Sequence, residues 1–216
     1  MMTRSSTKPL DEPSTIGLLS APQVRLAFDT NAIFGLKNFL TLCDELERIR
    51  DKLDNQIILC MSAIVLSEKI FDLQQKLRER FDYVGFKTSL QERRIELLSF
   101  GEKDALGFGT LMFDLCPDDA SWRTLKWQHY LRIVGSYLAS GNSQADLSIS
   151  TPPKNKNLPA TIDWLIAAHA QERGCILVTN DKGSEFRHVQ HVQFEILKKA
   201  AASILQCPRP ASGGQS

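Results

Sequence analysis

Four acidic residues of this chain occupy positions from which they could act together. Asp29 and Asp181 each close a short apolar run, whereas Glu68 and Asp163 lie in segments whose apolar spacing predicts helices. Carboxylates gathered at one place repel each other unless a cation neutralises them. Oxygen ligands without histidine or cysteine suit Mg²⁺ or Mn²⁺. Such a cluster is suited to phosphoryl chemistry, because the metal activates a water and stabilises charge on the attacked phosphate.

The segment around Asp29 predicts a buried parallel strand that leads into a helix. Residues 24–28 form a short, mostly apolar run, and Thr30 and Asn31 are residue types that cap helices. Asp29 then stands at the carboxyl end of the strand, where open α/β sheets place their ligands. The alternative is that Asp29 only caps the following helix.

Each of the other acids also has an alternative explanation. Glu68 is the lone carboxylate of an apolar helix, where it is costly unless paired or bound to a cation, or it lies in solvent beside Lys69. Asp163 suits the positive end of its helix whatever its function. These explanations differ from acid to acid, whereas one shared site accounts for all four. His169 is expected to be packed or exposed rather than catalytic, because it has no evident partner for proton transfer.

The rest of the pattern alternates strands and helices. We predict strands at 24–28, 57–61, 93–101, 175–179 and 191–196, and helices at 34–53, 63–80, 102–114, 120–139, 160–170 and 197–205; a helix is also compatible with 93–101. This order implies a mostly parallel sheet with helices on both faces. In a doubly wound sheet the strands before Asp29 and Asp181 can be neighbours at the switch point, which would bring these two acids side by side.

The composition predicts one domain with polar ends. A chain of 216 residues with 43% hydrophobic content can build one packed core, which we assign to residues 23–206. Residues 1–22 and 207–216 are predicted to be disordered tails. Residues 117–157 form an extra helical and loop segment within the domain.

The cysteines and the hydropathy indicate a cytoplasmic protein. The five cysteines include no C-x-x-C pair and several lie in apolar runs, as expected for reduced, buried thiols. No signal peptide and no apolar run long enough for a bilayer is seen, so we expect no membrane association.

The charges predict only a local nucleic-acid surface. Lysine plus arginine, 26 residues, nearly balances aspartate plus glutamate, 25 residues. Lys154 and Lys156 precede the helix of Asp163, and Lys182 follows Asp181, so we expect the three lysines to rim the acidic pocket and bind RNA phosphates. The alternative is that they are solvated loop charges.

These motifs resemble the PIN-domain nucleases, and among them the VapC-type toxins of toxin–antitoxin pairs. The resemblance covers about residues 24–116 and 158–197, and the matching segments are 28–31, 62–68, 163–170 and 177–181, with Phe186 behind the last. It implies a PIN-like fold with a five-stranded parallel sheet, a Mg²⁺ or Mn²⁺ site and endoribonuclease activity. It further implies an antitoxin as a candidate partner, and a homodimer is a second candidate assembly. Residues 117–157 depart from these toxins, which usually have a short loop there.

Carried over by position, the resemblance assigns roles to seven residues. It makes Asp29, Glu68, Asp163 and Asp181 the catalytic, metal-holding acids, and Thr30, Asn31 and Thr179 the groups that orient carboxylates or water.

Three other functions were weighed against the toxin ribonuclease. A haloacid-dehalogenase-type phosphatase needs a second aspartate two residues after the first, and Asn31 stands there instead. A housekeeping RNA-processing nuclease would use the same acids. A non-catalytic PIN-like module that binds RNA or protein would not need all four of them.

Overall fold

The strands form one parallel sheet in the order β3-β2-β1-β4-β5. The computed structural model describes residues 7–116, 118, 120–121, 161–180, 186 and 189–207. Its strands are β1 (Gln23–Phe28), β2 (Gln56–Ser62), β3 (Glu96–Leu98), β4 (Ile176–Thr179) and β5 (His191–Gln193). Phe28, the last residue of β1, pairs with Met61 of β2 on one side and with Val178 of β4 on the other. The predicted fold class, a five-stranded and mostly parallel sheet flanked by helices, is confirmed, and every pairing is parallel.

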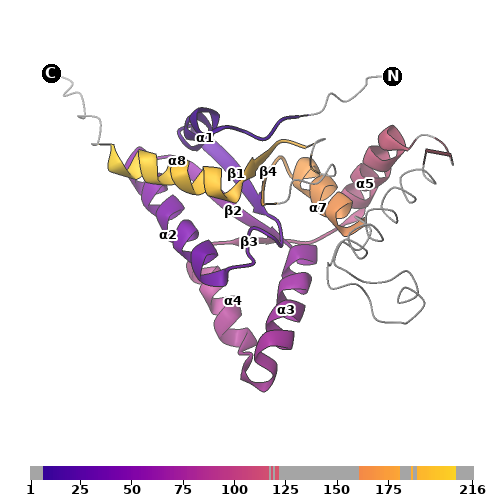
Figure 1. The fold of residues 1–216 in the computed structure, drawn as a ribbon, viewed down its shortest axis with the longest axis horizontal. Coiled ribbons are helices and arrows are strands. Elements are labelled where there is room, and N and C mark those ends of the chain that lie inside the picture. Colours follow the sequence, from indigo (N-terminus) through magenta and orange to yellow (C-terminus); the bar gives the residue numbers. More distant parts are fainter. Residues whose placement is uncertain are drawn as a thin grey trace, which may run out of the picture.

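Helices cover both faces of this sheet (Figure 1). They are α1 (Glu12–Leu19), α2 (Leu36–Leu53), α3 (Ala63–Leu77) with the 3₁₀ turn η1 (Arg78–Arg80), α4 (Tyr83–Glu92), α5 (Glu102–Leu115), α7 (Thr161–Glu172) and α8 (Phe194–Gln206). Helices α2 and α8 pack together on one face, and α3 and α7 contact β2 and each other on the opposite face. Within the part of the chain that the structure describes, no helix combines the length and the apolar character needed to cross a membrane.

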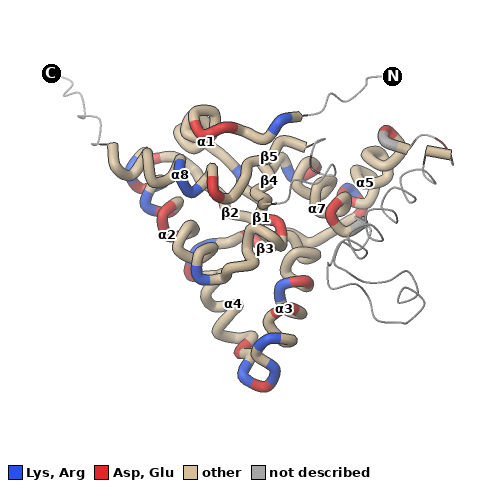
Figure 2. Tube along the Cα trace, in the orientation of Figure 1, with Lys and Arg blue, Asp and Glu red and all other residues tan. Residues whose placement is uncertain are grey.

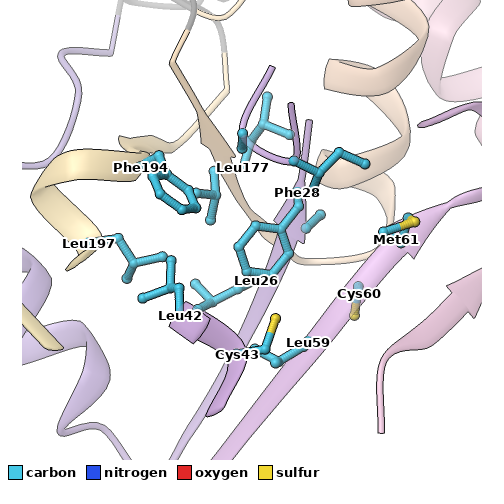
Figure 3. Close-up of a cluster of buried hydrophobic side chains, with 14 of the residues drawn as sticks. Leu26, Phe28, Leu42, Cys43, Leu59, Cys60, Met61, Leu177, Phe194 and Leu197 are labelled. Atoms are coloured by element: carbon cyan, nitrogen blue, oxygen red, sulfur yellow. The ribbon is translucent and has the colours of Figure 1, made fainter. Parts of the chain in front are cut away.

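Burial of both faces of β1 explains why its sequence is almost continuously apolar. Leu26 and Phe28 point to the side of α2 and α8, where Leu42 and Leu197 meet them (Figure 3). Ala27 lies between them in sequence and is buried too, because successive side chains point to opposite faces and both faces are covered. A parallel sheet packed in this way places its polar groups at the strand ends.

Helix α3 begins without a loop at the end of β2. Ser62, the last residue of the strand, is its N-cap and accepts a hydrogen bond from the N–H of Val65 at 3.1 Å, as its residue type predicts. Because β2 is parallel to β1, this start lies at the same edge of the sheet as the residue after β1. Glu68 on α3 is thereby directed to the carboxyl edge.

The prediction of a disordered tail over residues 1–22 is wrong for the described residues from 7 onward. Asp11 caps α1 through the N–H of Ser14 at 2.9 Å, and Leu19 at the end of this helix is fully buried. Leu10 forms a parallel bridge with Val192 beside β5. A helix of only eight residues takes its stability from packing against α8, which its own sequence does not reveal.

Three other elements differ from the prediction. Helix α4 was not predicted, the third strand is only Glu96–Leu98, and α8 begins at Phe194 and shortens the last predicted strand. Residues 122–139 of the predicted helix, almost all of the 117–157 segment and the C-terminal tail beyond 207 lie outside the described residues. Strand ends are decided here by how far neighbouring strands pair, and apolar runs alone do not show that length.

The buried thiols agree with the expectation from the sequence. All five cysteines are free; Cys43, Cys60 and Cys175 are buried, Cys116 is half-buried and Cys207 is exposed.

Candidate acidic site at the carboxyl edge of the sheet

Asp29 is held rigidly at the end of the central strand. Its N–H donates to the carbonyl of Val178 at 2.9 Å, so it continues the pairing of β1 with β4. Its Oδ1 accepts from the N–H of Thr30 at 2.7 Å, and its Oδ2 accepts from Thr179 Oγ1 at 2.8 Å. The residue is only 1% exposed, and a buried carboxylate is tolerated when it is hydrogen-bonded in this way.

Thr30 connects Asp29 to Glu68. Its N–H binds the Asp29 carboxylate, and its hydroxyl donates to the carboxylate of Glu68. Glu68 is half-buried, whereas its neighbour Lys69 is 2% exposed and donates to Asp72 Oδ2 at 3.0 Å. The alternative that Glu68 simply lies in solvent beside Lys69 does not hold, because Glu68 is half-buried and bonded by Thr30. The structure brings two of the four predicted acids to one threonine.

Asp163 approaches the same edge on another helix. It is half-buried in the first turn of α7, and this helix leads directly into β4. Since β4 runs parallel to β1, the helix that enters it must begin at the carboxyl edge, where Asp29 lies. Topology therefore directs Asp163 to the edge of the sheet that holds Asp29.

Several predicted site residues are not placed by the structure. Asp181 and the three lysines, Lys154, Lys156 and Lys182, lie outside the described residues. Asn31 is described and its side chain is exposed. Among the described residues, no three His, Cys, Asp or Glu side chains are grouped so that they could hold a metal ion. Asp29 and Glu68 offer only oxygen donors, which fit Mg²⁺ or Mn²⁺ in kind, and the four-acid site stays a prediction.

An ion pair that was not predicted joins α5 to the residue just past α7, between a buried carboxylate and an arginine that is partly exposed. Arg173, just past α7, donates to Asp104 through Nε at 3.0 Å and through a terminal nitrogen at 2.7 Å. The N–H of Gly101 donates to the same carboxylate at 2.7 Å. Burial raises the pKa of Asp104, but these hydrogen bonds outweigh it and the pKa lies below its usual value. The one local signal was an acid three residues after Gly101, the spacing of a capping box.

His169 packs in this network. It is 1% exposed, its ring meets Phe100 edge to face, and Nε2 lies 3.6 Å from Asp104 Oδ1. Burial lowers its pKa, against the attraction of Asp104. The expectation of a packed histidine is met. The network fixes α5 against α7, the helix that carries Asp163.

Comparisons with known proteins leave the fold and the site as the main observations. No protein-family model matches the chain, and no curated protein matches it. Among solved structures, it is similar to VapBC2 from Rickettsia felis bound to a DNA fragment from their promoter, with a TM-score of 0.40, 18% identity, and coverage of 79% of this chain and 98% of that one. VapBC-1 from nontypeable Haemophilus influenzae gives a TM-score of 0.39, 21% identity, and coverage of 80% and 99%. Both structures share less than 25% identity with this chain, at TM-scores below 0.5.

The fold and the acidic site therefore define the class of protein. It is an α/β domain with a five-stranded parallel sheet. At the carboxyl edge of this sheet, Thr30 donates one hydrogen bond to Asp29 and another to Glu68.

Proposed function

We propose that this chain is a metal-dependent endoribonuclease whose site is built on Asp29. The observation that carries the proposal is the way Asp29 is held: it is almost fully buried, yet bonded by Thr30 on one side and Thr179 on the other. Helix α2 begins at Leu36 with Gly35 as its N-cap and no side-chain cap. Asp29 therefore does not cap this helix, and its orientation calls for another explanation.

The described residues supply charge and orientation for such chemistry. Mg²⁺ or Mn²⁺, held by Asp29 and Glu68 with Asp163 and Asp181 as further proposed ligands, would activate water and stabilise charge on the phosphate. Thr179 fixes one oxygen of Asp29, and Thr30 sets the spacing between Asp29 and Glu68. Groups that orient ligands in this way raise the precision of a site that is held on rigid strands and helices. RNA as the substrate is supported by the motifs that resemble PIN-domain nucleases.

The test is cleavage of RNA by the full chain with and without Mg²⁺, compared with Asp29→Asn. This variant keeps the shape and removes the charge, so cleavage should fall by orders of magnitude while the circular dichroism spectrum is unchanged. Asp51→Asn is the matched control, because this side chain is 72% exposed on α2. Undiminished cleavage by Asp29→Asn would refute the proposal. Metal-independent RNA binding without cleavage by the parent would instead identify a binding module.

The motif resemblance also supports a cognate antitoxin as the partner. If the gene next to that of this chain encodes a small DNA-binding protein, its product should co-purify with the chain and suppress cleavage. A parent chain that cleaves RNA with no such neighbour is a housekeeping nuclease.

A further inference from the structure

An exposed aromatic ring lies in the loop that joins Asp29 to α2. Phe34 is 60% exposed, although it follows the fully buried Ile33. The N–H of Ile33 lies 3.3 Å from the carbonyl of Asp29 and 3.2 Å from that of Thr30, so the loop is a tight turn with a buried anchor. The ring is therefore presented to solvent from a fixed backbone.

Helix α3 also holds the backbone of Phe34 in place. Lys69, the residue after Glu68, is 2% exposed at its side chain and donates from Nζ to the carbonyl of Phe34 at 3.2 Å. The backbone of Phe34 is thus held by the neighbour of one acid, and the loop that carries it begins at the other, Asp29. The Phe34 ring is therefore connected to Asp29 through a short segment of backbone and to Glu68 through the hydrogen bond of Lys69.

Two ammonium groups accompany the ring. Lys76 Nζ lies 4.3 Å from the ring centroid of Phe34, and Lys69 Nζ lies 5.8 Å from it. Asp72 pairs with both lysines, at 3.0 Å and 2.7 Å, and the side chain of Lys76 stays half-exposed. These three residues share one face of α3, because positions three, four and seven apart lie on one side of a helix. Charged residues continue along α3 to the turn at its far end (Figure 2).

We propose that Phe34 is a stacking platform for an unpaired base of the RNA, with Lys76 beside it to meet the phosphate backbone. A nucleotide offers a flat π-face and an anion, which are the complements of an exposed ring and a half-exposed ammonium group. An apolar protein side chain would cover the ring, but it would also displace water from the Lys76 ammonium group without offering an anion in its place. The inference rests on the proposed function, and it names the part of the substrate that this surface recognises.

The chain provides a matched control in Phe71. It is also 60% exposed and lies on α3, but it stands two residues after Lys69 and so projects from the opposite side of the helix. There it lines a hollow of about 570 Å³ with Gln74, Gln75 and Arg78. Its substitution removes as much exposed ring without touching the platform.

The experiment measures binding of a short single-stranded RNA to the full chain carrying Asp29→Asn, which prevents cleavage. Adding Phe34→Ala should weaken binding about five- to a hundredfold, whereas Phe34→Trp should preserve it and Phe71→Ala should leave it near the parent value. The same RNA is then tested with one base removed at each position in turn. At one position, removing the base should weaken binding to the Asp29→Asn chain but should not weaken binding further when Phe34→Ala is also present. The two losses are not additive there, because the ring and that base are partners.

Each outcome decides a separate point. Parent affinity in Phe34→Ala, or losses that add at every abasic position, overturns the platform. A lower solution mass of Phe34→Ala with unchanged RNA affinity also overturns it, and assigns the ring to contact with a second copy. Failure of the parent chain to cleave RNA overturns the nuclease, but the abasic pattern still decides the stacking. Circular dichroism of each variant excludes loss of folding.

Discussion

A single buried hydroxyl sets the geometry of the candidate site. Thr179 ends β4, is 0% exposed, and donates its hydroxyl to Asp29 Oδ2 across the boundary between β4 and β1. A buried hydroxyl is costly without a partner, and the carboxylate is held in one orientation because this partner does not move. Thr179 therefore acts on the chemistry through Asp29.

We expect Thr179→Val to reduce cleavage while the chain still folds. Valine keeps the shape and β-branching, but a buried carboxylate loses one hydrogen bond, so the free energy of unfolding should fall by about 1–3 kcal/mol. RNA cleavage and Mg²⁺ affinity should fall roughly 10- to 100-fold, the usual effect of losing a group that orients a metal ligand. Thr41→Val is the control, because its exposed hydroxyl bonds only the Lys37 carbonyl of its own helix. Parent-like cleavage by Thr179→Val would show that the hydroxyl is only structural.

At the scale of elements, α1 protects the edge of the sheet. The N–H of Leu10 donates to the carbonyl of His191 at 2.9 Å, so the segment before α1 pairs with the outer strand β5. Ser203 of α8 donates to Glu12 at 3.1 Å, and α1 packs along α8. An uncovered edge strand invites pairing with other chains. The N-terminal segment is therefore part of the folded domain.

Two substitutions in α1 should change stability in opposite directions. Leu19→Ala removes a fully buried side chain and should cost about 2–5 kcal/mol. Gly17→Ala should add about 0.5–1 kcal/mol, because a Cβ there meets nothing within 4 Å and alanine favours the helix. Denaturant unfolding of the full chain measures both. If neither variant departs from the parent, α1 is not docked in solution.

At the scale of the molecule, charge is nearly balanced. The formal net charge is +1, so long-range attraction of RNA is weak and binding depends on lysines placed near the site. Lys76 on α3, half-exposed beside the Phe34 ring, is one such lysine. Lys154, Lys156 and Lys182 lie outside the described residues, and their place at the rim stays a prediction from their order in the sequence.

Replacing Lys154 and Lys156 together with alanine should weaken RNA binding and flatten its salt dependence. Loss of two phosphate contacts to a single strand should lower the slope of log K against log salt by roughly 1.4. Metal affinity should be nearly unchanged. The double variant Lys198→Ala, Lys199→Ala is the control, because both lysines are exposed on α8, which covers the sheet face opposite α3. An unaltered affinity and slope would make the 154–156 loop a tether only.

The sequence by itself determined most of the elements and the end of the first strand. Apolar periodicity records local burial, so β1, α2, β2, α3 and β4 follow from it to within a few residues. Asp29 falls after β1 wherever that strand lies in the sheet, and Ser62 caps α3 because of its own side chain. These features depend only on residues close together in the chain.

The tertiary structure decided which residues meet. The resemblance named Thr30 and Thr179, but only the pairing of β1 with β4 brings Thr179 to Asp29, and only the packing of α3 brings Glu68 to Thr30. The ion pair of Asp104 with Arg173 and the docking of α1 are likewise contacts between residues far apart in sequence. Their energies depend on strand register and helix packing, and a local pattern of residues carries neither.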